Sequence, residues 1–176
     1  ILGDEIFHRG ALQGIPRADA LAPLQQAAVL RPDFVPIWEH LAWVAIAEGD
    51  AVTAADALEK YGQLGDRGDS SVAHVGELIR AGYIWRFAPE REAIAAMEAV
   101  LAQPATVAWA DVFAGPSFLL TFEVPRATVW LGERFVQGVP RKGLETTGLV
   151  AQAYGLVALG HPDSGVVLAR RAAERS

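Results

Sequence analysis

Few side chains in this sequence have the type and spacing that catalysis requires. The stretch from Gly143 to Gly148 has the glycine spacing of a phosphate-binding loop, but Leu149 stands where that loop needs a lysine. Residues 115–119 begin like a nucleophile elbow around Ser117, but the closing glycine of that motif is missing. The sequence has no cysteine, which excludes thiolate catalysis and cysteine-ligated zinc. We therefore predict that the chain is not an enzyme and uses no cofactor.

The four histidines are the remaining candidates for metal binding. His40 and His74 are 34 residues apart, a separation that places them at equivalent positions of neighbouring helices in a repeating chain. Packed helices lie about 8–10 Å apart, whereas zinc needs each nitrogen within about 2.1 Å. We therefore predict no metal site, and we interpret His8, His40, His74 and His161 as packed or surface side chains.

The composition is that of an acidic chain rich in apolar residues. Hydrophobic residues make up 52% of the 176 positions, which is ample for a large buried core. The formal net charge of −6 does not provide the basic surface that neutralises nucleic-acid phosphates, so we expect no nucleic-acid partner. The longest clean apolar run covers residues 41–47 and is far shorter than the ~20 residues that span a bilayer. We therefore expect no membrane segment.

The ends and the residue usage suggest where the chain comes from. Alanine is abundant, asparagine is absent, and only 2 of the 15 basic residues are lysines, a bias typical of bacterial genomes rich in G and C. The first residues do not have the layout of a signal peptide, and the last helical segment has no clear cap. We expect a cytoplasmic fragment of a longer bacterial protein.

Signals for the end of one helix and the start of the next recur at nearly equal intervals. Glycine favours a helix end and proline is tolerated at the first helical position, so the two together mark such a boundary. New helices are predicted to begin at positions 16, 51, 89, 125 and 162, which are 35, 38, 36 and 37 residues apart. Before position 51, Asp50 takes the place of proline as a side-chain N-cap. A period in the thirties is typical of stacked helix pairs.

The residues after these starts have helical spacing. After Asp50, apolar residues such as Ala54, Leu58 and Tyr61 follow at steps of three and four. Sustained two-residue alternation between hairpin turns, which would indicate strands, is not found. We therefore predict an all-α fold, a single α-solenoid of about ten helices in five pairs. The repeats are expected at about 1–33, 34–68, 69–104, 105–142 and 143–176.

The second and fifth pairs match a known repeat motif. The matching residues are Trp38, Leu41, Ala42, Ala45, Gly49, Ala54, Leu58 and Tyr61, and then Leu149, Ala153, Leu156, Gly160, Gly165, Ala169 and Ala172. Their spacing resembles the tetratricopeptide repeat, whose helix pairs stack into an α–α superhelix. The third pair has Tyr83 at the turn glycine, and residues 115–116 would break the first helix of the fourth. The opening segment is also similar to repeat regions of bacterial regulatory proteins.

The resemblance implies a non-enzymatic scaffold that binds a protein or peptide on its concave face. In the family register, the first helix of each pair lines that face, and Trp43 and Tyr154 would be its aromatic anchors. The full set of expected partner-contact residues is Glu39, Trp43, Ile46, Glu77, Arg80, Tyr154 and Val157. By the same resemblance, the chain would be the regulatory part of a larger bacterial signalling protein.

Two other functions fit the same predicted fold. A small apolar ligand would need a closed pocket, for which Trp43, Trp85 and Phe87 are the expected lining. Self-association would use the apolar faces that incomplete repeats leave at the two ends of the array. The sequence leaves both alternatives open.

Overall fold

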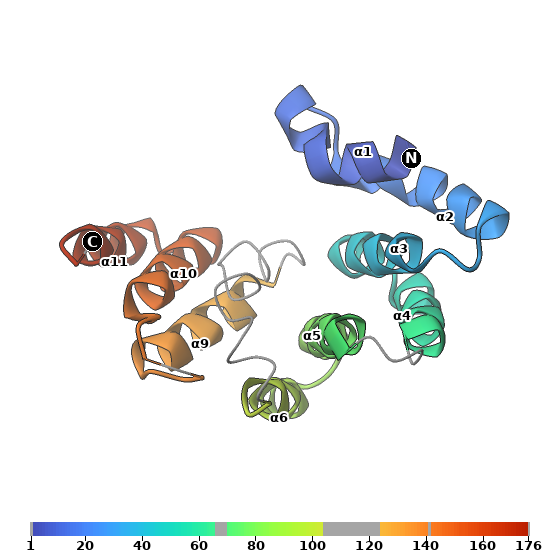
Figure 1. The fold of residues 1–176 in the computed structure, drawn as a ribbon. Helices are drawn as coiled ribbons and strands as arrows, with labels where there is room; N and C mark the ends of the chain where they lie inside the picture. Colours follow the sequence, from blue (N-terminus) through green and yellow to red (C-terminus); the bar gives the residue numbers. More distant parts are fainter. Residues whose placement is uncertain (1, 66–69, 104–123, 141, 176) are drawn as a thin grey trace. The chain divides into compact units, whose positions relative to one another are not determined.

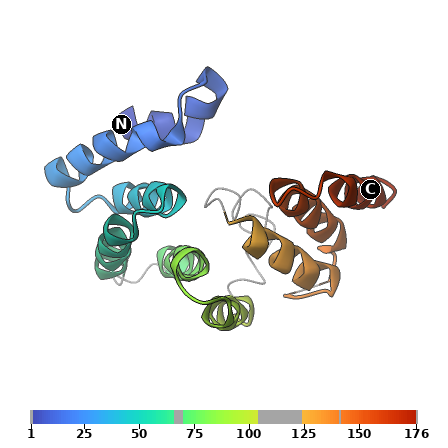
Figure 2. The same cartoon turned by 180° about the vertical axis from the view of Figure 1, so that it is seen from behind.

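A computed structural model describes the chain except for residues 1, 66–69, 104–123, 141 and 176. All regular secondary structure in the described part is helical, which confirms the predicted all-α class. The chain divides into two compact units, Ile1–Glu90 and Arg91–Ser176, whose helices are drawn from opposite sides in Figures 1 and 2. This boundary falls inside the predicted third pair, so a continuous superhelix over 1–176 stays a prediction.

The first unit is built from successive helices that pack on their neighbours. Its described elements are α1 (Leu2–Arg9), η1 (Gly10–Gln13), η2 (Arg17–Ala20), α2 (Leu21–Leu30), α3 (Val35–Glu48), α4 (Ala51–Gly65) and α5 (Ser70–Phe87). Helix α3 contacts α2 and α4, its neighbours in sequence, and also α1 and α5. Contact between near neighbours is the repeat-like pattern expected of stacked helix pairs.

The second unit contains the remaining described helices. These are α6 (Glu90–Leu101), which begins one residue before the unit boundary, α9 (Pro125–Val136), α10 (Glu145–Ala158) and α11 (Pro162–Ala173). Helix α10 packs against both α9 and α11. Arg134 of α9 forms an ion pair of 3.0 Å with Glu98 of α6. The predicted helix break at residues 115–116 lies outside the described residues. Among the described helices, none combines the length and apolar character needed to cross a bilayer.

The predicted helix starts are confirmed to within one residue. The α-helices begin at Ala51, Glu90, Pro125 and Pro162, where the sequence predicts starts at 51, 89, 125 and 162; at the start predicted at 16, the short 3-10 helix η2 begins at Arg17 and the α-helix α2 follows at Leu21. At Pro125 and Pro162 the reason is local, because proline pre-sets the backbone angle of the first helical turn and has no N–H to leave without a partner.

The turn between α3 and α4 has the predicted end and cap. Gly49 has φ of +77°, a left-handed conformation that favours glycine, and it ends α3. The backbone N–H of Thr53 donates a hydrogen bond of 3.0 Å to Oδ1 of Asp50, as expected of an N-cap. In the third pair, where Tyr83 replaces the turn glycine, α5 continues through that position and ends at Phe87.

Helix α3 is the centre of the first unit's core. Its residues Val44, Ala45 and Ile46 are fully buried, as is Ala54 of the partner helix α4. Small side chains at positions such as Ala45 let neighbouring helices approach, while larger ones fill the gaps between them. The core therefore surrounds α3 on several sides rather than along a single stripe.

In the second unit, helices approach through glycines. A Cβ on Gly132 of α9 would lie 2.6 Å from the carbonyl oxygen of Gly148 of α10, and one on Gly148 would lie 2.5 Å from the carbonyl oxygen of Gly132. On the other side of α10, a Cβ on Gly165 of α11 would lie 2.8 Å from the carbonyl oxygen of Ala153. The backbones are so close that no side chain fits between them.

We expect Gly132→Ala to lower the free energy of unfolding by about 1–3 kcal/mol, because the added methyl overpacks the contact between α9 and α10. Thermal and urea unfolding followed by circular dichroism measure the change. Gly62 of α4 is the matched control, since a Cβ there meets nothing within 4 Å. Gly62→Ala should raise stability by about 0.5–1 kcal/mol. Equal stabilisation by both substitutions would contradict the close approach.

Loss of the α4 N-cap should also be measurable. Hydrogen bonds from the side chain and then the backbone of Thr53 lower the pKa of the Asp50 carboxyl, so the cap is formed by the ionised side chain. We expect Asp50→Ala to reduce the free energy of unfolding by about 1 kcal/mol in urea titrations at neutral pH. Asp50→Asn retains a capping oxygen and should cost less. An alanine variant as stable as the parent chain would show that this cap contributes nothing.

Candidate functional site

The predicted partner-contact residues on α3 are largely covered by the first unit itself. Ile46 is fully buried, which corrects its prediction as a groove contact, because several helices pack around α3 and leave this position in the core. Trp43 is half-buried, and its ring lies edge-on to Phe7 of α1 with the centroids 6.1 Å apart. Glu39 is also half-buried, and burial raises the pKa of its carboxyl above the ordinary value of 4.5.

The predicted contacts on α5 and α10 lie at the surface of their units. Glu77 and Arg80 of α5 are exposed. Tyr154 and Val157 of α10 are 57% and 51% exposed, and their spacing of three puts them on one face of the helix. These four side chains are accessible, and their role in binding a partner stays a prediction.

The first unit has a cleft of about 690 Å³ lined by α1, α2 and α3, which we call the α1–α3 cleft. Much of its lining is apolar, and three of its large side chains are well exposed: Leu2 is 65%, Leu30 78% and Phe34 48% accessible. Its polar lining consists of Asp4, Gln26, Arg31 and His40. An apolar cleft with a few polar groups is the usual form of a binding site.

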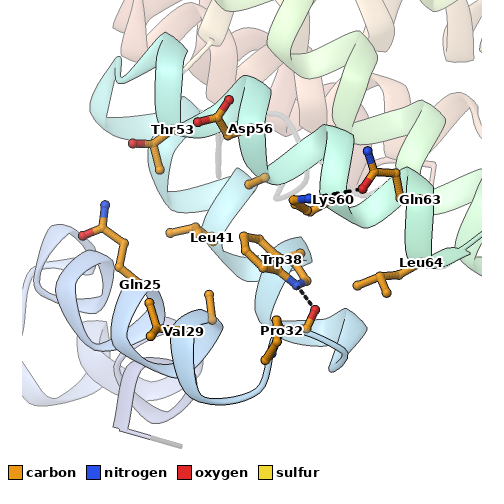
Figure 3. A pocket seen from close by; sticks show the side chains of 12 residues that line it. Gln25, Val29, Pro32, Trp38, Leu41, Thr53, Asp56, Lys60, Gln63 and Leu64 are labelled. Carbon is orange, nitrogen blue, oxygen red and sulfur yellow. Dashed lines mark hydrogen bonds between the residues drawn. The ribbon is translucent and has the colours of Figure 1, made fainter.

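A second cavity of about 530 Å³ is lined by α2, α3 and α4 (Figure 3). The indole N–H of Trp38 donates a hydrogen bond of 2.9 Å to the carbonyl oxygen of Pro32, which fixes the ring at this cavity. Lys60 and Asp56 line the cavity from α4, and Val29 from α2. Neither cavity has the lining of Trp43, Trp85 and Phe87 that the small-ligand alternative predicts.

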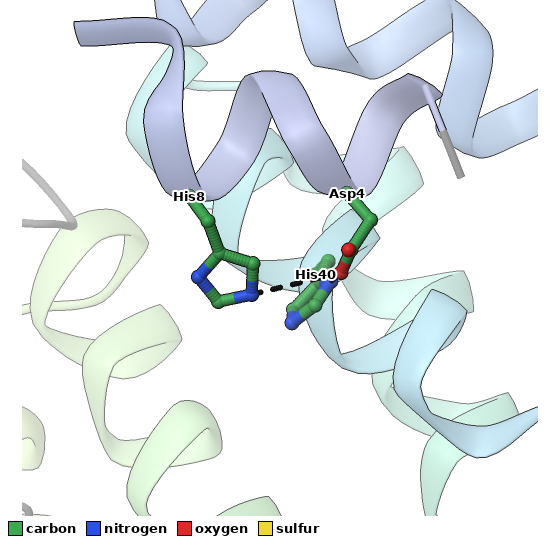
Figure 4. Close-up of side chains that lie close together, drawn as sticks. All are labelled: Asp4, His8 and His40. Carbon is green, nitrogen blue, oxygen red and sulfur yellow. Dashed lines mark ion pairs between the residues drawn. The ribbon is translucent and has the colours of Figure 1, made fainter. Parts of the chain in front are cut away.

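Three side chains that can bind a metal converge between α1 and α3 (Figure 4). Oδ1 of Asp4 lies 3.1 Å from Nδ1 of His40 and 3.6 Å from Nε2 of His8. One ligand atom from each residue can be chosen so that all three lie within 4.8 Å of one another. Asp4 and His8 are a helical turn apart on α1, and we call the group the Asp–His–His cluster.

His40 is the most buried member of the cluster. Its side chain is 12% exposed, and the ring of Phe7 stacks on it at 4.4 Å between centroids and 18° between planes. Burial and the neighbouring His8 lower the pKa of His40 from its ordinary value of 6.5, while Asp4 acts in the opposite direction. Asp4 and His8 are more than half exposed, so the cluster is open to solvent on their side.

Sequence reasoning missed both the α1–α3 cleft and the cluster. The pairing considered was His40 with His74, because their separation matches the repeat period. The partner in the structure is instead His8, which belongs to the preceding helix pair. The spacing of four between Asp4 and His8 could have drawn attention to α1, since such residues share a helix face. The third residue, His40, joins the cluster only through the packing of α1 on α3, which local spacing does not reveal.

We expect acid to destabilise the first unit through His40. A lowered folded-state pKa means that the unfolded chain binds the proton more tightly, so this contribution is present above about pH 6.5 and is lost as the pH falls towards the folded-state pKa. The raised pKa of Glu39 has the opposite effect: its contribution to the free energy of unfolding falls as the pH rises above about 4.5. The free energy of unfolding should therefore fall less in His40→Gln than in the parent chain between about pH 7.5 and pH 5.5.

Urea titrations in EDTA at the two pH values measure the free energy of unfolding of both chains. Because both chains retain Glu39, the difference between them reports on His40. Identical pH dependence of the two chains would contradict the burial argument for His40.

Comparison with protein-family models, with curated proteins and with solved structures finds no match to this chain. The resemblance to tetratricopeptide repeats therefore rests on the residue spacing given above.

Proposed function

We propose that this chain is a non-enzymatic scaffold that binds an apolar segment of a protein or peptide partner in the α1–α3 cleft. The observation that carries the proposal is the exposure of Leu2, Leu30 and Phe34 around a cleft of about 690 Å³. Bulky apolar side chains gathered at one cleft are what a partner's apolar side chains can cover, at about 25 cal/mol per Å² removed from water.

The polar groups of the cleft support a peptide as the occupant. Arg31 lies with its guanidinium carbon 5.9 Å from the centre of the Phe34 ring and forms an exposed ion pair of 3.3 Å with Asp33. A cation held beside an aromatic ring at a cleft suits a segment that carries a carboxylate next to its apolar residues. The partner we propose is therefore an apolar segment with an acidic flank.

The exposed face of α10 is the second surface of the proposed scaffold. Tyr154 and Val157 fit the register in which the first helix of a tetratricopeptide pair contacts a partner. By the same resemblance, we propose that the chain is the regulatory part of a larger bacterial protein in the cytoplasm.

A small apolar ligand is the second candidate occupant of the α1–α3 cleft. Its volume of about 690 Å³ falls within the range of about 300–1,000 Å³ that is typical of small-molecule sites. Self-association is the third candidate, favoured by Val166 and Val167, which are 48% and 64% exposed on α11.

The test uses peptides selected from a display library against the complete chain. We expect them to carry apolar residues with an acidic flank, and we expect Leu30→Glu to weaken their binding at least tenfold, because truncating or charging a central contact costs about 2 kcal/mol or more. Isothermal titration calorimetry measures the affinity. Val52→Glu is the matched control, since Val52 is 73% exposed on α4 and does not line the cleft.

Other outcomes identify other functions. If Tyr154→Ala weakens peptide binding and Leu30→Glu does not, the peptide binds at α10, and the proposed binding in the α1–α3 cleft is contradicted. Displacement of bound peptide by a small apolar dye would support the small-ligand candidate. A mass that rises with concentration in light scattering, and is lowered by Val167→Glu, would support self-association.

A further inference from the structure

The Asp–His–His cluster offers one carboxylate oxygen and two imidazole nitrogens at a single point. His8 and Asp4 project from α1, and His40 projects from α3 towards them (Figure 4). Imidazole together with a carboxylate suits zinc, copper and nickel, whereas calcium and magnesium prefer oxygen ligands alone. The donor set therefore selects a class of ion.

Two of the three ligand-atom separations in the cluster are close to those of a coordination sphere, and all three ligand atoms lie within 4.8 Å of one another. Ligand atoms at 2.0–2.1 Å from a tetrahedral zinc ion are about 3.4 Å from each other. The separations of 3.1 Å between Asp4 and His40 and of 3.6 Å between Asp4 and His8 bracket that value. The side chain of His8 is 57% exposed, so it can rotate to complete the site without disturbing the core.

The surroundings of His40 hold its ring in one place, since its side chain is only 12% exposed. The stacked ring of Phe7 holds His40 in place, and the guanidinium carbon of Arg17 lies 5.4 Å from the centroid of the same Phe7 ring. Neighbours that fix a ligand's orientation are a general feature of metal sites.

We propose that Asp4, His8 and His40 bind one divalent transition-metal ion of the zinc class, which links α1 to α3. Three protein ligands leave the fourth position of a tetrahedral ion for water or for a side chain of a bound partner. Metal binding to the folded chain stabilises the packing of α1, an eight-residue helix that is too short to be stable by itself.

The test is a zinc titration of the complete chain, freed of any affinity tag and treated with EDTA before dialysis. We expect one zinc ion per chain by isothermal titration calorimetry, with low-micromolar or tighter affinity, and a higher melting temperature in zinc than in EDTA. His8→Ala removes an exposed ligand without touching the core, and it should weaken binding by at least about 10–100-fold. Asp4→Asn should also weaken it, while calcium should give no signal.

The control variant is His161→Ala, which removes an exposed histidine from the second unit and should leave zinc binding unchanged. Melting of every variant in EDTA separates loss of the site from loss of the fold. Equal zinc affinity in the parent chain and His8→Ala, loss of affinity in His161→Ala, or calcium binding as tight as zinc would each overturn the proposal. These titrations contain no peptide, so their outcome is independent of peptide binding in the α1–α3 cleft.

Discussion

The burial of α3 on several sides is the constraint on which the first unit depends. Val44, Ala45 and Ile46 are consecutive and all fully buried, so no face of this stretch is left for solvent. A helix surrounded in this way needs neighbours on each side before all of its apolar surface is removed from water. The helices before and after α3 are therefore held by the same core, and the α1–α3 cleft lies outside this buried stretch, on α1, α2 and the start of α3.

The second unit achieves close packing by different means. Where α3 uses alanine and larger apolar side chains, α9 and α10 place Gly132 and Gly148 in direct backbone contact. The gain is in dispersion between closely packed atoms, and its cost is the conformational freedom that glycine loses on folding. Gly148 makes this contact from the buried side of α10, whereas Tyr154 and Val157 of the same helix are exposed.

The features that could be predicted from the sequence are those decided by neighbouring residues. Proline and glycine placed the helix starts, and Asp50 was identified as a cap, because these effects act within one turn of the chain. Ile46 was misplaced because its face depends on how many helices surround α3. The Asp–His–His cluster could not be derived either, since the separation of 36 residues between Asp4 and His40 follows from the packing of two helices and not from local spacing.

The α1–α3 cleft and the Asp–His–His cluster are physically connected because Asp4 and His40 belong to both. One wall of the cleft is α1, which packs on α2 and η2 and meets α3 through the cluster and the stack of Phe7 on His40. Whatever fixes α1 against α3 also fixes that wall. Two ligands that favour the same placement of α1 must each strengthen the binding of the other, by an equal factor, since coupling between sites is reciprocal.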